Sequence, residues 1–222
     1  MTFDGGGFDA VGFDAMRFDA VLFDVDGVLL DSAAAHRRIW DAWARLRGLD
    51  AEDVWRRTFG RRPEDTVREV APGLDPAAER RVLDGLMERE GDAFPPMDGA
   101  AALLGALPAD GWALVTSGSR GPVRERFRRG GLPLPAVQVY GEDVRNAKPH
   151  PDAYLLAAAR LGAAPERCAV VEDAPAGVAA GRAAGCTVIA VTSTHTRDQL
   201  AGADAWVASL PELGELLGDM AR

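Results

Sequence analysis

The chain has 222 residues, and its 25 basic and 34 acidic side chains give a formal net charge of −9. This balance argues against a nucleic-acid-binding protein, which needs a basic face for phosphate contacts. Cys168 and Cys186 are too few for a disulfide framework and lack the close Cys or His neighbours of a zinc site. We therefore expect core thiols in a reducing compartment. The absence of a long apolar run predicts no membrane partner and a cytoplasmic protein.

A five-residue repeat occupies the start of the sequence, with Phe-Asp at positions 3, 8, 13, 18 and 23. This period matches neither a helix face nor a strand face, and the glycines at 5–7 favour flexibility. We predict that residues 1–16 form a poorly ordered extension, with a short arm packed on a neighbouring surface as the alternative. Only the last copy is expected to be part of the fold.

Short apolar runs that end in polar turns recur along the rest of the chain. They are typical of strands buried on both faces, and they lie at 18–25, 112–116, 136–140, 168–172 and 187–192. Helix-like stretches at 121–129, 152–161 and 177–184 separate several of these runs. Alternating strands and helices predict an α/β protein with a doubly wound parallel sheet.

Residues 32–97 break this alternation, because they contain helix-type spacing and almost no strand-like run. We predict that they form an inserted helical subdomain, while residues 17–31 and 98–222 form the sheet domain. Three tryptophans of the insertion, Trp40, Trp43 and Trp55, are expected in its apolar core, with a ligand-stacking box as the alternative. Proline and glycine residues at 95–99 mark a hinge back to the sheet.

Two aspartates stand at the carboxyl end of the first predicted strand, in the sequence DVDGVLLDS that begins at Asp24. Ligands of open α/β sheets bind at this edge. A turn at Gly27 lets the Asp24 carboxylate and the carbonyl of Asp26 approach one magnesium ion. A carboxylate placed here can also attack phosphorus while its neighbour protonates the leaving oxygen. The alternative is an acidic turn after a strand.

The segment DVDGVLLDS resembles the nucleophile motif of the haloacid dehalogenase-like hydrolases, and three further motifs follow in the expected order. The resemblance covers residues 17–215. It implies a Rossmann-like parallel sheet core with an inserted α-helical cap. It also implies that Asp24 is the nucleophile and Asp26 the general acid/base.

The second motif, LVTSGSRGP, places Thr116 at the end of the next strand. The Thr116 hydroxyl and the amides of Ser117 and Gly118 are candidates to hold a phosphate group, because amides near a helix start attract anions. An ordinary helix-capping cluster is the alternative. The third motif, NAKPHPDAY, matches the family's Lys-Pro-x-Pro at Lys148, whose charge would offset repulsion between nucleophile and phosphate. The alternative is a solvated surface lysine.

The fourth motif is the acidic pair Glu172 and Asp173 in VVEDAPAGVAAGRAAG. Carboxylate oxygens are hard ligands that suit Mg²⁺. The resemblance implies that Asp173 binds Mg²⁺ together with Asp24 and the main-chain oxygen of Asp26, while Glu172 binds directly or through water. Helix capping by Asp173 is the alternative reading of this pair.

The resemblance extends to a subgroup, the glycerol-phosphate and deoxysugar-phosphate phosphatases, through TFGRRPEDT in the insertion and the second and fourth motifs. It implies a Mg²⁺-dependent phosphatase that hydrolyses small sugar or polyol phosphates through an aspartyl-phosphate. Arg62 would reach from the cap to the substrate, although Arg61 is an alternative because Pro63 replaces the usual Thr. His36, at the start of the insertion, would orient substrate or couple closure to acid/base action, with a structural role as the alternative.

Two other functions stay open at this point. A β-phosphoglucomutase-like enzyme shares the motifs, but needs groups in the cap that hold a bisphosphate, and the sequence offers no convincing set. A non-catalytic protein that senses a phosphorylated metabolite is the third reading. In each case the expected partner is a small phosphorylated metabolite, and the expected assembly is a monomer or weak homo-oligomer.

Overall fold

The structure, a computed structural model, describes residues 18–91 and 93–218 and contains one parallel six-stranded sheet. The strands are β1 (Ala20–Phe23), β2 (Trp112–Val115), β3 (Val137–Val139), β4 (Cys168–Glu172), β5 (Thr187–Val191) and β6 (Ala205–Val207). Their order across the sheet is β3-β2-β1-β4-β5-β6. The strand β1 is central, because Val21 lies opposite Trp112 of β2 and Ala169 of β4.

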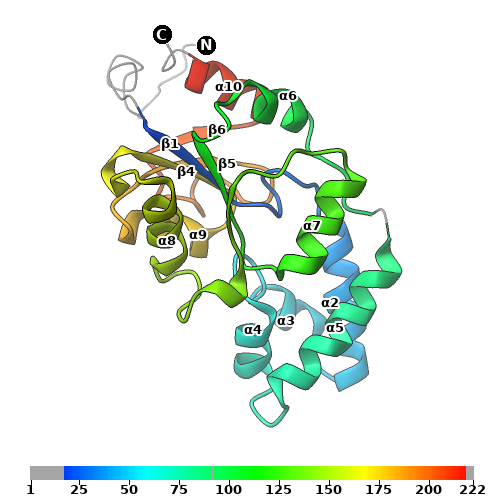
Figure 1. Ribbon diagram of the computed structural model, residues 1–222. Coiled ribbons are helices and arrows are strands. Elements are labelled where there is room, and N and C mark those ends of the chain that lie inside the picture. The colour runs from blue at the N-terminus through cyan, green and yellow to red at the C-terminus, as the bar shows by residue number, and fades with distance from the viewer. Residues whose placement is uncertain (1–17, 92, 219–222) are drawn as a thin grey trace, which may run out of the picture.

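Helices cover both faces of the sheet (Figure 1). They are α6 (Ala100–Ala106), α7 (Arg120–Arg129) and α10 (Leu210–Gly218) on one face, and α8 (Asp152–Leu161) and α9 (Pro175–Ala183) on the other. Val21 and Phe23 of β1 belong to the first apolar core, whereas Leu22 belongs to the second. Side chains of a strand alternate between its faces, so burial on both sides explains the continuous apolar run.

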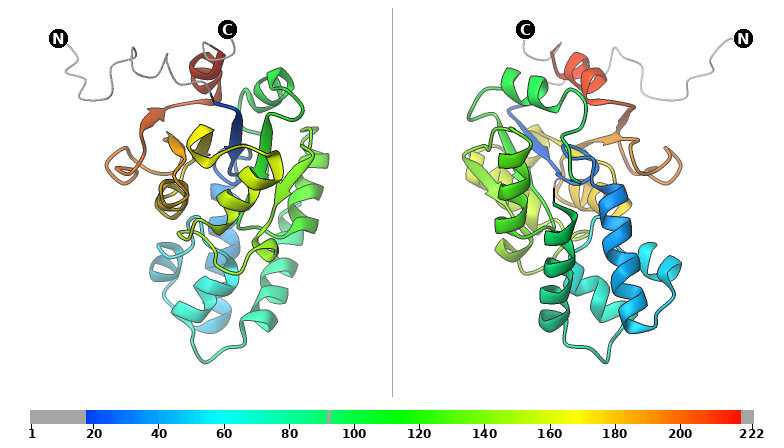
Figure 2. Two further views of the ribbon diagram at one scale, coloured as in Figure 1. Left: turned by 60° about the vertical axis from the view of Figure 1, so that its left-hand side comes forward. Right: turned by 90° about the vertical axis from the view of Figure 1, so that its right-hand side faces the viewer.

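A second group of helices lies together below the sheet in Figure 1, near the carboxyl end of β1. This helical subdomain contains α2 (Ala33–Arg47), α3 (Ala51–Trp55), α4 (Pro63–Val70) and α5 (Pro76–Glu90), and it has its own apolar core. Figure 2 shows α2 and α5 side by side. Trp40 and Trp43 are buried in this core and Trp55 packs against it, which confirms the expected core role, although Trp40 and Trp55 also line the cavity described below.

Local sequence signals set several ends of these helices. The Asp75 side chain accepts a hydrogen bond of 3.0 Å from the amide of Ala77 at the start of α5, and Asp50 caps α3 in the same way at 2.7 Å. Such caps satisfy amides that have no partner within the helix. Gly48 ends α2 in the left-handed conformation at φ 66°, which glycine adopts without a steric cost.

The α/β class, the parallel sheet and all five predicted strands are confirmed, with ends that differ by at most two residues. The sequence analysis did not predict β6, α6 or α10. The strand β6 has three residues and pairs only with β5, so too little pattern marks it. The fourth Phe-Asp copy is also part of the fold: Phe18 packs on the core and Asp19 forms an ion pair of 2.7 Å with Arg167. The extension predicted for 1–16 lies outside the described residues.

Cys168 and Cys186 are free and buried, as expected for core thiols. Within the residues that the structure describes, no helix has both the length and the apolar character needed to cross a membrane.

Candidate active site

Four acidic or hydroxyl side chains meet at the carboxyl edge of the sheet. Asp24 directly follows β1, and Thr116 directly follows β2. Glu172 is the last residue of β4, and Asp173 comes directly after it. Parallel strands all end at the same edge, so residues far apart in the sequence converge there. All four are at least nine-tenths buried. The edge therefore collects negative charge in a region that water hardly reaches.

Lys148 lies at the centre of this cluster. Its Nζ donates hydrogen bonds of 2.6 Å to Oδ1 of Asp24 and 2.7 Å to Oε1 of Glu172. Burial lowers the pKa of Lys148, but the two carboxylates raise it by a larger amount. The pKa therefore lies above its usual value. The side chain is therefore a buried cation, and the solvated-lysine alternative is wrong. Lys148 is also the only lysine among the 25 basic residues of the chain, a signal that the sequence analysis overlooked.

Glu172 is held by four donors. Oε1 accepts from Lys148 and, at 2.7 Å, from the hydroxyl of Tyr154, and Oε2 accepts from the amides of Asp173 and Ala174 at 3.0 and 3.3 Å. Both carboxylate oxygens are thus engaged within the protein. This arrangement fits a residue that orders Lys148 and the start of α9. The capping alternative for Asp173 is wrong, because the N-cap position of α9 is Ala174.

Three carboxylates of the cluster could hold a cation. Ligand oxygens of Asp24, Glu172 and Asp173 all lie within 4.8 Å of one another. Burial is the main cause that raises the pKa of Asp24 to about 7 and that of Asp173 well above its usual value. When all three carboxyl groups are ionised, Lys148 supplies one positive charge against three negative charges, and the cluster is then net negative. Hard oxygen donors with this charge fit a divalent ion such as Mg²⁺.

Gly27 allows the loop after β1 to approach the acidic cluster. Its φ is +83°, and a Cβ atom at this position would lie 2.1 Å from Oδ2 of Asp173. Asp173 is further fixed by hydrogen bonds from the hydroxyl of Thr194 to its main-chain oxygen at 3.0 Å and to its carboxylate. The sequence analysis gave Thr194 no role, because it follows the last predicted strand and no motif includes it.

Asp26 points away from this cluster toward a pair of basic side chains. Nη1 of Arg126, on α7, lies 2.7 Å from Oδ1 of Asp26, and Nε2 of His36 lies 3.8 Å from the same oxygen. Burial acts to raise the pKa of Asp26, but Arg126 and His36 together lower it to about 2. Burial also lowers the pKa of His36. Asp26 is therefore a carboxylate in this arrangement, paired chiefly with Arg126.

The second motif forms a tight turn between β2 and α7. Oγ1 of Thr116 accepts a hydrogen bond of 3.0 Å from the amide of Gly118. The hydroxyl of Ser117 donates to the carbonyl of Gly60 at 2.9 Å, and Gly60 belongs to the helical subdomain. The helix itself starts after Ser119, whose side chain makes no capping hydrogen bond. Thr116 and Gly118 thus border the acidic cluster, while the Ser117 side chain joins the two halves of the protein.

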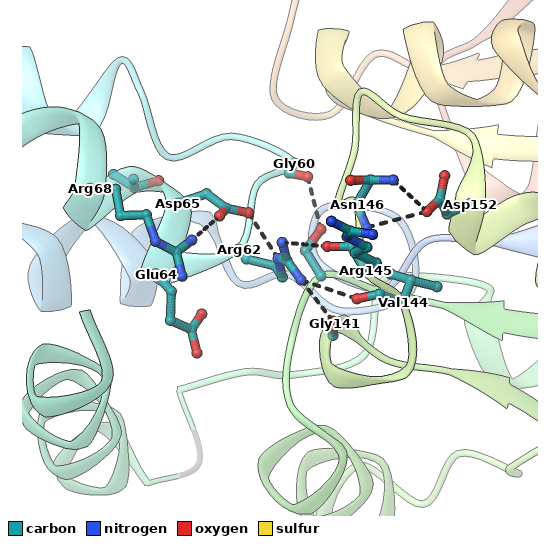
Figure 3. Close-up of polar contacts among 12 residues, drawn as sticks. Gly60, Arg62, Glu64, Asp65, Arg68, Gly141, Val144, Arg145, Asn146 and Asp152 are labelled. Carbon is teal, nitrogen blue, oxygen red and sulfur yellow. Dashed lines mark hydrogen bonds and ion pairs between the residues drawn. The ribbon is translucent and has the colours of Figure 1, made fainter. Parts of the chain in front are cut away.

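Arg62 binds the sheet domain rather than the cavity (Figure 3). Its guanidinium donates to the carbonyls of Gly141, Val144 and Arg145 at 3.2 to 3.3 Å, and it forms an ion pair of 2.8 Å with Asp65. Its donors are therefore occupied by main-chain oxygens and by the Asp65 carboxylate. Arg62 does not line the cavity in this arrangement, and its contact with substrate stays a prediction.

A cavity of about 110 Å³ separates the sheet edge from the helical subdomain. Asp24, Asp26 and Thr116 form its floor, and Arg61, rather than Arg62, is part of its wall. Arg61 also forms an ion pair with Glu69. The side toward the subdomain carries both polar side chains, among them Arg80 and His36, and the apolar side chains of Trp40, Trp55, Phe59, Leu83 and Met87. The cavity can therefore hold an anion at the sheet edge and an attached organic group against the subdomain.

A sequence model of the haloacid dehalogenase-like hydrolase family matches residues 18–185. The chain belongs to this family. It is 44% identical over 194 residues to hexitol phosphatase A of Escherichia coli strain K12, covering 85% of this chain and 90% of that protein. It is 35% identical to glycerol-1-phosphate phosphohydrolase 2 of Saccharomyces cerevisiae, over 79% of this chain and 75% of that one.

Among solved structures, the hydrolase superposes on a putative β-phosphoglucomutase of Bacteroides vulgatus with a TM-score of 0.80 and 28% identity. The superposition covers 95% of this chain and 92% of the other. The resemblance inferred from the four motifs is thus confirmed, and the hydrolase is an enzyme related to phosphatases of sugar and polyol phosphates.

Gly177 offers a test of how tightly Glu172 is held. In Gly177→Ala the new Cβ atom would lie 1.7 Å from Oε1 of Glu172, which Lys148 and Tyr154 already hold. We expect the free energy of unfolding to fall by about 3 kcal/mol, because the hydrogen-bonded side chain of Glu172 cannot move away from the new methyl group. Urea denaturation followed by circular dichroism measures this change.

The matched control is Gly85→Ala, since a Cβ atom added in α5 meets nothing within 4 Å. This variant is expected to gain roughly 0.5–1 kcal/mol, because alanine favours helix over glycine. Equal effects of the two substitutions would show that Glu172 is not packed as described.

The raised pKa of Asp24 predicts how the stability of the metal-free protein depends on pH. The folded-state pKa of about 7 exceeds 3.8, the usual value of an aspartate in an unfolded chain, so protonation stabilises the fold and this stability is lost as pH rises through 7. From about pH 8 to about pH 6, wild type should gain about 1 kcal/mol relative to Asp24→Asn. Histidines whose pKa is lowered act in the opposite direction, but they are present in both proteins.

Chemical denaturation in EDTA at both pH values gives this difference directly. Added Mg²⁺ should stabilise wild type more at the higher pH, where protons no longer compete for Asp24. A difference between the two proteins that does not vary with pH would contradict the prediction.

Proposed function

We propose that this hydrolase is a Mg²⁺-dependent phosphatase that hydrolyses small sugar or polyol phosphate monoesters through an aspartyl-phosphate. The observation that carries the proposal is the placement of Asp24. This buried carboxylate accepts a hydrogen bond from Lys148 on one oxygen, belongs to a cluster of three carboxylates that could hold a cation, and borders a cavity lined on its far side by apolar and basic side chains. The similarity to hexitol phosphatase A supports the substrate class.

In the first step, an oxygen of Asp24 attacks phosphorus and the bond from phosphorus to the ester oxygen breaks. Lys148 balances the negative charge on Asp24 and on the incoming phosphoryl oxygens. The hydroxyl of Thr116 donates a hydrogen bond to one of these phosphoryl oxygens. Asp26 takes up a proton from solvent when the substrate binds and gives this proton to the departing alkoxide. The approaching phosphate dianion raises the proton affinity of Asp26, which offsets the effect of Arg126.

In the second step, Asp26 accepts a proton from a water molecule, and that water attacks phosphorus. The bond from phosphorus to Asp24 breaks, which regenerates the Asp24 carboxylate and releases inorganic phosphate. The ionised form of Asp26 that its pairing with Arg126 favours is the form required here. Ser117 and Gly118 add binding groups beside the phosphoryl oxygens in both steps.

Asp24, Asp173 and the main-chain oxygen of Asp26 would hold Mg²⁺, with Glu172 acting directly or through water. When bound, the ion neutralises phosphoryl charge and aligns the phosphate with the nucleophile. We further propose the division into a core of 17–31 and 98–222 and a cap of 32–97. The apolar side chains of this cap contact the leaving group, and His36 lies where cap and core meet.

Phosphate release from a panel of sugar, polyol and nucleotide monophosphates tests the proposal. Release with Mg²⁺ from sugar or polyol phosphates, lost in EDTA and restored by added Mg²⁺, is expected. Release from no phosphate monoester by the Mg²⁺-loaded protein would overturn the phosphatase assignment.

A β-phosphoglucomutase-like activity is the second candidate, because the solved structure with a TM-score of 0.80 carries that description. Isomerisation of a sugar phosphate that depends on a bisphosphate, without net phosphate release, would favour it. A binding protein for a phosphorylated metabolite is the remaining reading, and saturable binding without either turnover would identify it. The buried free cysteines support a reducing compartment, and we propose the cytoplasm.

A further inference from the structure

Arg126 is a buried cation that the mechanism above leaves without a task of its own. It lies on α7, outside the four motifs, and only 7% of its surface is exposed. It nevertheless lines the cavity between the sheet edge and the helical subdomain. Buried arginines need partners for their donors, and those partners indicate what the side chain does.

Two contacts fix the plane of the guanidinium. Nη1 donates to Oδ1 of Asp26 at 2.7 Å, and the guanidinium carbon lies 4.8 Å from the ring centre of Phe94. Gly118 borders a third side, because a Cβ atom there would lie 3.6 Å from Nη2, at ordinary contact distance. The guanidinium therefore sits between Asp26 and the turn of the second motif, in a defined orientation.

One donor of this group has no acceptor within the described parts of the chain. Nε of Arg126 is buried and makes no hydrogen bond there. Nε and Nη2 lie on the same edge of a guanidinium and donate in parallel, which suits two oxygens of one ligand. The free Nε therefore indicates a ligand that supplies acceptors to this edge.

The position of Arg126 identifies which part of a substrate reaches it. Phosphoryl oxygens belong near Lys148, Thr116 and the acidic cluster, whereas Asp26 faces the ester oxygen of the leaving alcohol. Arg126 contacts Asp26 and therefore lies on the side of the alcohol. The Asp26 carboxylate already balances the charge of Arg126. The ligand therefore needs no negative charge, and two neutral oxygens can accept the hydrogen bonds from Arg126.

We propose that Arg126 is a specificity-determining residue that binds neighbouring hydroxyl groups of the leaving alcohol. This inference rests on the proposed phosphatase function and names the part of the substrate that is recognised. It predicts selection for polyhydroxy alcohols over simple alkyl alcohols of the same length. Arg126 thereby contributes a polar contact opposite the apolar side chains of the subdomain.

Steady-state kinetics with glycerol 3-phosphate and n-propyl phosphate test the proposal, because the two leaving groups differ mainly in hydroxyl number. In Arg126→Met, KM for glycerol 3-phosphate should rise about tenfold to a hundredfold, because the substrate loses its hydrogen bonds to a charged donor. KM for n-propyl phosphate should stay within about threefold. Arg126→Lys should recover part of the selectivity, since it restores a donor but not the paired edge.

Arg124→Met is the matched control, because Arg124 is exposed on the same helix. Its kinetic constants should not change. An equal loss of kcat for both esters at unchanged KM would mean that Arg126 acts only by holding Asp26, and would overturn the proposal. Wild type could instead prefer an ester that carries a carboxylate, such as phosphoglycolate, and lose this preference in Arg126→Met. That result would overturn the proposal, because it would show that Arg126 binds a second anion and not hydroxyl groups.

Binding measurements separate this proposal from the phosphatase proposal. Calorimetric titration of the metal-free protein with glycerol 3-phosphate and n-propyl phosphate should show the same loss of selectivity in Arg126→Met. If wild type hydrolyses neither ester but prefers glycerol 3-phosphate in binding, the phosphatase fails and the subsite stands. Equal binding of both esters by wild type overturns the subsite, whatever the turnover.

Discussion

Asp24→Asn is expected to lower kcat for phosphate monoester hydrolysis by at least about 10⁴-fold. The amide nearly matches the carboxylate in size but cannot form a covalent bond to phosphorus. Lys148 keeps its second partner, Glu172, at 2.7 Å, so the cluster does not lose its only anion. Removal of a buried carboxylate whose pKa is raised to about 7 should leave the melting temperature unchanged or higher near neutral pH.

Initial rates of phosphate release measure the effect, and acid-quenched protein analysed by mass spectrometry measures the phosphoryl group on Asp24. Asp31→Asn is the matched control, because Asp31 lies in the same loop and is exposed. It should retain activity within about twofold. Activity in Asp24→Asn above a few per cent of wild type, with correct folding, would mean that another group attacks phosphorus.

Substitution of Lys148 is expected to produce the second largest effect. Lys148→Met leaves Asp24 and Glu172 together in a buried site without their common cation. We expect the free energy of unfolding near neutral pH to fall by about 3–5 kcal/mol, the usual cost of removing one partner of a buried ion pair. The activity should fall by about 10³-fold or more, because the charge opposite the phosphoryl group is absent.

Lys148→Arg separates charge from shape. It retains the positive charge, but the planar guanidinium does not fit between two carboxylates that lie 2.6 and 2.7 Å from Nζ. We expect this variant to be more stable than Lys148→Met yet also to lose most activity. Full activity in Lys148→Arg would show that charge alone matters. Thermal melts in parallel with the phosphate assay distinguish a folding defect from a catalytic one.

The sequence alone determined the sheet and the positions that face its carboxyl edge. Buried strands require continuous apolar runs, and the polar residues that follow such runs must converge when the strands are parallel. Asp24, Thr116 and Asp173 directly follow such runs, so their proximity follows from the pattern, whereas Lys148 lies nine residues beyond β3 and reaches Asp24 only through the folded loop. The identity of the family followed from the same residues, since four motifs in one order are far more specific than one.

The tertiary structure decided which of several similar side chains turns toward the cavity. Five arginines lie between 120 and 129, and only packing of α7 against the sheet selects Arg126 to meet Asp26, 100 residues away. Arg61 and Arg62 are neighbours with the same chemistry, yet carbonyls after β3 hold Arg62 outside the cavity.

The same limit applies to Tyr154 and to the short elements. Tyr154 reaches Glu172 because α8 packs on β2 and β3, and no local pattern distinguishes it from a core tyrosine. The strand β6 and the helices α6 and α10 are stabilised by contacts with the sheet domain. A sequence pattern specifies the face that an element buries, but contacts between elements distant in the chain fix which single side chain meets which partner.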